Sequence, residues 1–162
     1  MSGIAVISDV HGNLEALEAV LACIDGLAVD AVYSLGDAVG YGPDPEACLR
    51  VTASRCRVRL MGNHEYAVLH TNLGFTFNPV AQKALEWTRG RVRDARLLDL
   101  ISGLQPHRQE GEALFVHGSA RDALEEYVTE SDSRGYSVFD EMVESLEKDF
   151  TSFRLCFVGH NH

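Results

Sequence analysis

The stretch Ser34-Leu35-Gly36-Asp37-Ala38-Val39-Gly40-Tyr41-Gly42 decides the expected fold. It follows the apolar run Ala31-Val32-Tyr33, which is typical of a buried strand, and it places the carboxylate of Asp37 in a glycine-rich turn just past that strand. Open α/β sheets bind their ligands at the carboxyl ends of their strands. Asp37 is therefore the first candidate for a functional residue.

Four other apolar runs lead to polar residues in the same way. The runs cover residues 4–7, 57–61, 113–116 and 154–158. The polar residues that follow them are Asp9 and His11, Asn63 and His64, His117, and His160 and His162. Five of the seven histidines fall in these strand-end clusters, and only His70 and His107 do not. This pattern predicts that one end of a sheet gathers the side chains into a single site.

Helical patterns separate the predicted strands. Apolar residues recur at helical spacing over residues 14–24, between the first two strands, and this arrangement predicts a right-handed βαβ unit. Further helices are expected over 45–54, 79–87, 94–101 and 137–146, with a helical turn at 66–70 and with Leu85 and Trp87 in the core. Residues 71–77 and 121–134 are expected to be loops, and loops near a site often shape substrate access.

Composition restricts the class of protein. The chain has 162 residues, enough for one domain, with 46% hydrophobic and 23% charged residues. A net charge of −10 argues against a broad basic surface for nucleic acid or an anionic membrane. No run is long enough to span a membrane, and no signal peptide is recognised, so the cytoplasm is the expected location. The four cysteines are expected to be reduced, buried thiols.

The strand-end residues suggest a particular chemistry. They offer oxygen and imidazole donors without a thiolate, a mixture that suits Mn, Fe, Zn or similar divalent ions. Seven donors are too many for one tetrahedral ion, but they suit two ions that share a bridging carboxylate. Two ions roughly 3.5–4 Å apart form the clamp used for in-line displacement at phosphorus. The candidate ligands are Asp9, His11, Asp37, Asn63, His117, His160 and His162.

The ordered motifs SDVHGN, GD, GNHE, VHGS and GHNH resemble those of the calcineurin-like metallophosphoesterase superfamily. The version GDAVGYGPDP is similar to that of its small bacterial cytosolic branch. The motifs extend over residues 8–162, so the resemblance covers nearly the whole chain. It implies an α/β fold with two sheets in an α/β/β/α sandwich. Relatives continue for several strands after the last motif, whereas this sequence ends at His162, so we expect a single domain over residues 1–162 that lacks C-terminal strands.

The resemblance also implies a role for each residue. Asp9, His11 and His162 would bind one divalent ion, and Asn63, His117 and His160 the other. Asp37 would bridge the two ions, among which Mn is favoured over Fe, Zn, Ni or Mg. His64 would be the catalytic residue that faces the phosphate and helps to protonate the leaving oxygen. A hydroxide bridging the two ions would be the nucleophile.

One departure from the family pattern concerns the substrate. Relatives that are phosphoprotein phosphatases follow GD with an acid–arginine pair, and this sequence has Gly40 and Tyr41 there. The arginine that would hold a phosphomonoester dianion is missing at that place, and Glu65 is the candidate substitute for the acid that would pair with the catalytic histidine. We therefore expect a small phosphate ester as substrate, with phosphodiesterase activity favoured.

Two alternatives stay open. The first is a phosphomonoesterase that acts on nucleotides or on Ser/Thr phosphoproteins. The second is a non-catalytic scaffold of the same fold that binds proteins. His64 argues against the scaffold, because such a protein has no need for a proton donor beside a full set of ligands. The oligomeric state and the natural substrate are not indicated by the sequence.

Overall fold

The computed structural model describes residues 3–71, 73, 77–128 and 153–162. Its first sheet is parallel, with the strand order β1 (Ile4–Ile7), β2 (Ala31–Ser34) and β3 (Val58–Arg59). Ile7 is paired with Ser34, so β1 and β2 end side by side. The turns that follow these two strands, with Asp9 and Asp37, therefore start from the same edge of the sheet.

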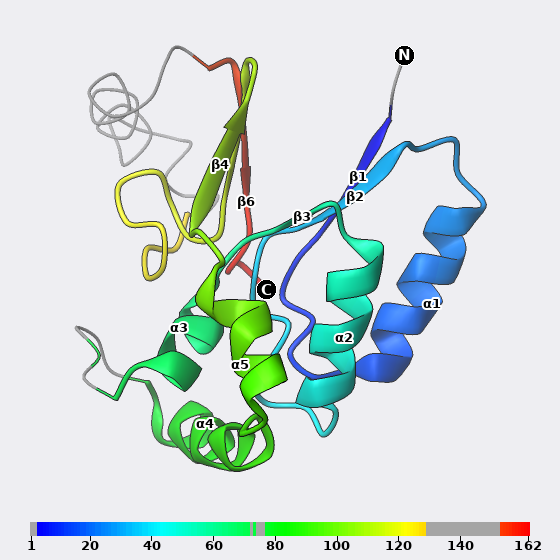
Figure 1. The fold of residues 1–162 in the computed structure, drawn as a ribbon. Helices are drawn as coiled ribbons and strands as arrows, with labels where there is room; N and C mark the ends of the chain where they lie inside the picture. Colours follow the sequence, from blue (N-terminus) through cyan, green and yellow to red (C-terminus); the bar gives the residue numbers. More distant parts are fainter. Residues whose placement is uncertain (1–2, 72, 74–76, 129–152) are drawn as a thin grey trace.

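Two helices cover the outer face of this sheet (Figure 1). They are α1 (Leu14–Asp25) and α2 (Pro45–Arg55). The Asn13 side chain accepts a hydrogen bond from the Ala16 amide at 3.1 Å, which is the predicted cap of α1. Leu17 and Leu21 of α1 are buried against Val32 of β2, so the apolar stripe of the helix seals the sheet. The predicted βαβ unit is confirmed.

The second sheet faces the first and is mixed. Its strands are β4 (His107–Glu110), β5 (Ala113–Val116) and β6 (Leu155–Val158), with β4 and β5 antiparallel and β5 and β6 parallel. The two sheets pack through an apolar layer in which the rings of Tyr33 and Phe115 are 5.0 Å apart. The predicted α/β fold with two sheets is therefore confirmed.

Strand β4 was not expected from the sequence. Its residues are polar and half of them are exposed, as suits the edge of a sheet, so it has no apolar alternation to reveal it. Glu110 at its end accepts a hydrogen bond from the Tyr33 hydroxyl, which joins the two sheets through a polar contact. A short turn at Gly111 connects β4 to β5.

Three helices lie beyond the carboxyl ends of the first sheet (Figure 1). They are α3 (Asn63–Leu69), α4 (Pro79–Arg91) and α5 (Ala95–Ser102). Leu97 and Ile101 of α5 pack with Ala38 and Val39 from the stretch after β2 and with Leu49 of α2. The loop that contains Asp37 is thus anchored in a hydrophobic cluster, which limits its freedom to move.

Some predicted details are wrong. Helix α3 starts at Asn63 rather than Tyr66, because the Glu65 carboxylate accepts the amide of Gly62 at 3.0 Å and so caps the first turn. Trp87 is 46% exposed and packs near Arg91, and Cys23 is exposed too, since both lie on the outer side of their helices.

Three of the predicted segments extend beyond the residues that the structure describes. The expected helix over 137–146 lies outside the described residues, as do parts of the loops at 71–77 and 121–134. In the described ranges, no helix has both the length and the apolar character that crossing a bilayer requires.

Candidate metal centre

The backbone takes an unusual conformation at the strand ends. Asp9, His11, Asp37 and His160 all have positive φ angles, of 56°, 50°, 54° and 64°. Residues with a side chain rarely adopt this left-handed region, and doing so costs of order 1–3 kcal/mol each. The two turns support each other, since the His11 amide donates to the Asp37 carbonyl at 2.8 Å. Such strain at four clustered polar residues indicates a functional site.

Glu65 holds the Asp37 loop in place. Its buried carboxylate accepts hydrogen bonds from the amides of Asp37, Val39 and Gly62, at 2.8, 3.0 and 3.0 Å. The expectation that Glu65 replaces the acid partner of the catalytic histidine is therefore wrong. Both carboxylate oxygens bind backbone amides, so Glu65 shapes the loop instead.

The first group of donors contains Asp9, His11 and His162, whose ligand atoms lie within 4.8 Å of one another. The Nδ1 atom of His11 lies 3.1 Å from the Val39 carbonyl oxygen. Because a carbonyl only accepts, Nδ1 donates and Nε2 keeps a lone pair. This Nε2 atom is 3.2 Å from Nε2 of His162 and 4.0 Å from Oδ1 of Asp9. The three side chains therefore converge on one point.

The second group contains Asp9, Asp37, His117 and His160, and their ligand atoms also lie within 4.8 Å of one another. The Nδ1 atom of His117 donates to the Leu35 carbonyl at 2.9 Å, which leaves its Nε2 lone pair facing the group. The His160 amide donates to Oδ2 of Asp9 at 3.0 Å. The parallel pairing of β5 and β6, with Val116 opposite Val158, brings these two histidines from strands far apart in the sequence.

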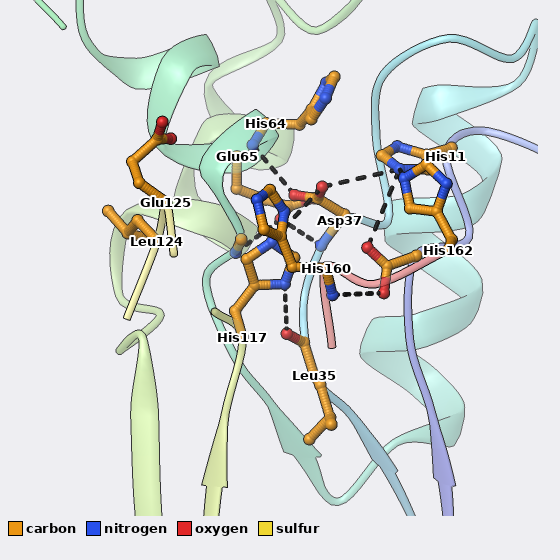
Figure 2. A network of polar contacts seen from close by, with 12 residues as sticks. His11, Leu35, Asp37, His64, Glu65, His117, Leu124, Glu125, His160 and His162 are labelled. Carbon is orange, nitrogen blue, oxygen red and sulfur yellow. Dashed lines mark hydrogen bonds and ion pairs between the residues drawn. The ribbon is translucent and has the colours of Figure 1, made fainter. Parts of the chain in front are cut away.

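Asp37 belongs to the second group and lies between its histidines and those of the first group (Figure 2). Its Oδ2 atom is 3.5 Å from Nε2 of His117 and 3.7 Å from Nε2 of His11. Its Oδ1 atom accepts the His64 backbone amide at 3.0 Å. One carboxylate therefore faces a histidine of each group, and the same carboxylate fixes the start of α3, where Asn63 and His64 lie.

The donor atoms fit divalent ions. Oδ1 of Asp9, Oδ1 of Asn63 and Nε2 of both His117 and His160 are buried without a hydrogen-bond partner. Unpaired buried polar atoms cost free energy and are rare in folded proteins, so several of them together point to a ligand that satisfies them. Carboxylate, amide and imidazole donors suit Mn, Fe, Zn and related ions.

The electrostatics favour the form of histidine that binds metal. Burial lowers the pKa of His117 to about 4, and burial together with the neighbouring imidazoles lowers the pKa of His64 to about 3. Burial first, then the charge of Glu65, raises the pKa of Asp37 well above its usual value. The imidazoles of His117 and His64 are thus neutral near pH 7, and a cation would relieve the crowding of the carboxylates.

A cavity of ≈ 340 Å³ opens beside these groups. Asp37, Asn63, His64, His160 and His162 line it, so the predicted catalytic histidine shares a space with the predicted ligands. His70 ends α3 and His107 lies in β4, so the structure places neither of them among the donors. The structure thus brings together all eight predicted site residues, while their roles stay predictions.

Apart from Tyr41, the remaining residues of the cavity wall were not predicted from the sequence. Tyr41, Phe77, Glu125 and Tyr127 also line it. Tyr41 belongs to the turn after β2, and the others come from the two segments expected to be loops. Burial raises the pKa of Glu125 to about 7. The one available signal was that unpatterned loops near a site often contribute to it.

The sequence is similar to a known protein family and to individual proteins. The family model described as calcineurin-like phosphoesterase matches residues 3–162. An uncharacterized protein of Methanocaldococcus jannaschii is 33% identical over 99% of this chain, which spans 63% of that protein. A symmetrical bis(5'-nucleosyl)-tetraphosphatase of Acidovorax is 31% identical over a region that covers 68% of this chain and 42% of the Acidovorax protein.

Solved structures agree on the fold. A metallophosphoesterase from Sphaerobacter thermophilus is 36% identical with a TM-score of 0.75. The match covers 97% of this chain and 59% of the Sphaerobacter chain. A putative diadenosine tetraphosphatase has a TM-score of 0.54 at 17% identity, over 74% of this chain and 55% of its own, which shows a shared fold alone. The chain spans about three fifths of the relatives it matches over nearly its full length.

Proposed function

The chain belongs to the calcineurin-like phosphoesterase family, and from this premise we propose that it is a phosphoesterase that uses two divalent ions and favours phosphodiesters. The position of Asp37, whose Oδ2 atom lies near a histidine Nε2 atom of each converging group of donors, is the observation that supports this proposal most strongly. Manganese is the favoured metal, and the cytoplasmic location expected from the sequence remains a prediction.

The residues suit the two ligand sets that the resemblance to the family implies. Asp9, His11 and His162 would hold one ion, and Asn63, His117 and His160 the other, with Asp37 shared. When bound, two such ions lower the pKa of a coordinated water and polarise the phosphoryl oxygens. The carbonyls of Val39 and Leu35 orient the rings of His11 and His117 so that their Nε2 atoms face the centre.

His64 would act on the leaving oxygen. Its backbone is fixed by Asp37, and its ring lies in the cavity, 4.8 Å between centroids from the ring of His11. The low pKa means that the resting ring is neutral, so it would reach the ester as an N–H donor. An anionic phosphate beside it would raise this pKa, so that a larger fraction of the rings would take up a proton from solvent and could pass it to the leaving oxygen.

The proposed preference for diesters rests on the residue at position 41, in the turn that follows Asp37. Tyr41 stands where a phosphoprotein phosphatase would have an arginine, and no lysine or arginine is among the described residues that line the cavity. A phosphodiester has one negative charge and needs less compensation than the dianion of a monoester.

The test is reconstitution of metal-stripped protein with Mn²⁺. We expect hydrolysis of bis(p-nitrophenyl) phosphate, with a higher kcat/KM than for p-nitrophenyl phosphate. A clear preference for the monoester would favour the phosphomonoesterase alternative. Bound Mn²⁺ without hydrolysis of either compound would contradict the enzymatic proposal and favour the scaffold.

A further inference from the structure

The cavity beside the metal centre has an aromatic wall. The ring of Tyr41 lies 4.9 Å from that of His64, and the ring of Phe77 lies 4.9 Å from His64 in an edge-on arrangement. The ring of Tyr127 stacks on that of His160 at 3.9 Å. These three rings, named here the aromatic wall, come from three separate segments and converge on one cavity.

The aromatic wall is accessible to a ligand. Tyr41 is 43% exposed and Tyr127 57% exposed, although both touch histidines of the site. Tyr41 also has a positive φ of 51°, a strained conformation that projects its ring beside His11 and His64. Large aromatic side chains left exposed next to a polar site are typical of surfaces that bind flat apolar groups.

The charge and the volume of the cavity indicate which class of ligand it can bind. In the part of the chain that the structure describes, its lining includes the acids Asp37 and Glu125 and no lysine or arginine. A chain of several phosphates would therefore meet little compensating charge away from the metal centre. The volume of ≈ 340 Å³ is near the lower end of small-molecule sites, which suits one ring system rather than two nucleosides.

We propose that this cavity binds a phosphate ester whose leaving group contains one flat aromatic ring, of the aryl or nucleobase class, with that ring held by Tyr41, Phe77 and Tyr127. The proposal rests on the phosphoesterase function proposed above, and it identifies the substrate class. His64 supports the assignment to the leaving group, because the residue expected to act on the leaving oxygen touches both Tyr41 and Phe77.

Binding of two phosphonates, which resist hydrolysis, tests the proposal without relying on turnover. Isothermal titration of Mn²⁺-loaded protein should show about tenfold tighter binding of phenylphosphonate than of methylphosphonate, as expected for one aromatic stacking contact. Tyr41→Leu combined with Tyr127→Leu should bring the ratio close to one, whereas Tyr41→Phe should keep it. Trp87→Leu removes an exposed ring outside the cavity and should leave the ratio unchanged.

The outcomes separate this proposal from the proposed function. Equal affinities for the two phosphonates in the unaltered protein, or binding of neither, would overturn the aromatic site. An unchanged ratio in the double variant would also overturn it. A tenfold preference for phenylphosphonate without hydrolysis of bis(p-nitrophenyl) phosphate would refute the enzymatic function and leave the ring-binding site standing.

Discussion

The carboxylate of Asp37 and the backbone amide of His64 are joined by a hydrogen bond of 3.0 Å. Through it, the loop after β2 fixes the first turn of α3, which contains both a candidate ligand, Asn63, and the candidate acid, His64. The other oxygen of Asp37 faces His11 and His117. Because one carboxylate lies near a histidine of each donor group and also binds the backbone of His64, the candidate catalytic residue, substitutions around it should separate metal binding from turnover.

Substitution of His64 should affect turnover alone. In His64→Ala the backbone amide that Asp37 accepts is kept, and we expect the metal content to stay unchanged. Loss of a positioned proton donor should lower kcat by about 10²–10⁴-fold. Elemental analysis together with steady-state kinetics on bis(p-nitrophenyl) phosphate would check this. Loss of the metals in this variant would show that His64 is a ligand.

Gly40 leaves room for the His64 ring. A Cβ atom at residue 40 would lie 2.2 Å from Nδ1 of His64, and the φ of 93° there also disfavours a side chain. Gly40→Ala should therefore displace the imidazole and lower kcat with little change in metal content. Gly90→Ala is the matched control, since nothing lies within 4 Å of its Cβ and alanine suits α4. Equal kcat values for the two variants would contradict this account.

Glu65 should matter for the stability of the folded protein. Glu65→Ala would leave the amides of Asp37, Val39 and Gly62 without their acceptor in a buried loop. We expect the free energy of unfolding of the metal-free protein to fall by about 3 kcal/mol or more. Urea denaturation measures this quantity. A loss below about 0.5 kcal/mol, within the range of ordinary surface substitutions, would show that the loop does not depend on this carboxylate.

The low pKa of His64 predicts a pH effect on the metal-free protein. The unfolded chain takes up a proton at this histidine near pH 6.5, whereas the folded protein does so only near pH 3. The folded state therefore loses stability as the pH falls through this window, and His64→Gln removes that contribution. Between pH 7 and 5 the unaltered protein should lose up to about 2 kcal/mol more than the variant. Identical pH dependence of the two unfolding free energies would refute the assignment.

The gathering of the site was predictable because parallel strands end at one edge of a sheet. Apolar runs that lead to Asp9 and Asp37 revealed this arrangement, whereas His117 follows β5 of the second sheet and reaches the site because the two sheets pack face to face. The role of Glu65 was not predictable, since its partners Asp37 and Val39 lie 28 and 26 residues away and are backbone amides, which leave no trace in the sequence pattern.

Strand β4 and the loops around the cavity also differ from what the sequence predicted, because their structure depends on tertiary contacts. Strand β4 lacks apolar alternation because it lies at an edge, and its polar residue Glu110 is bound to Tyr33 of the other sheet. The rings of Phe77 and Tyr127 come from irregular segments, whose conformation depends on tertiary packing rather than on local periodicity. Local patterns therefore predicted where the site forms, but not the loops that surround it.

The number of ions bound per chain, and its dependence on Asp37, tests the central claim most directly. Titration of metal-stripped protein with Mn²⁺ should give two ions per chain. Asp37→Asn keeps an oxygen that can accept the His64 amide but removes the negative charge between the donor groups, so it should weaken binding of both ions by at least about tenfold, and Asp37→Ala should bind neither tightly. A single ion in the unaltered protein, or two ions bound with unchanged affinity by Asp37→Asn, would contradict the account.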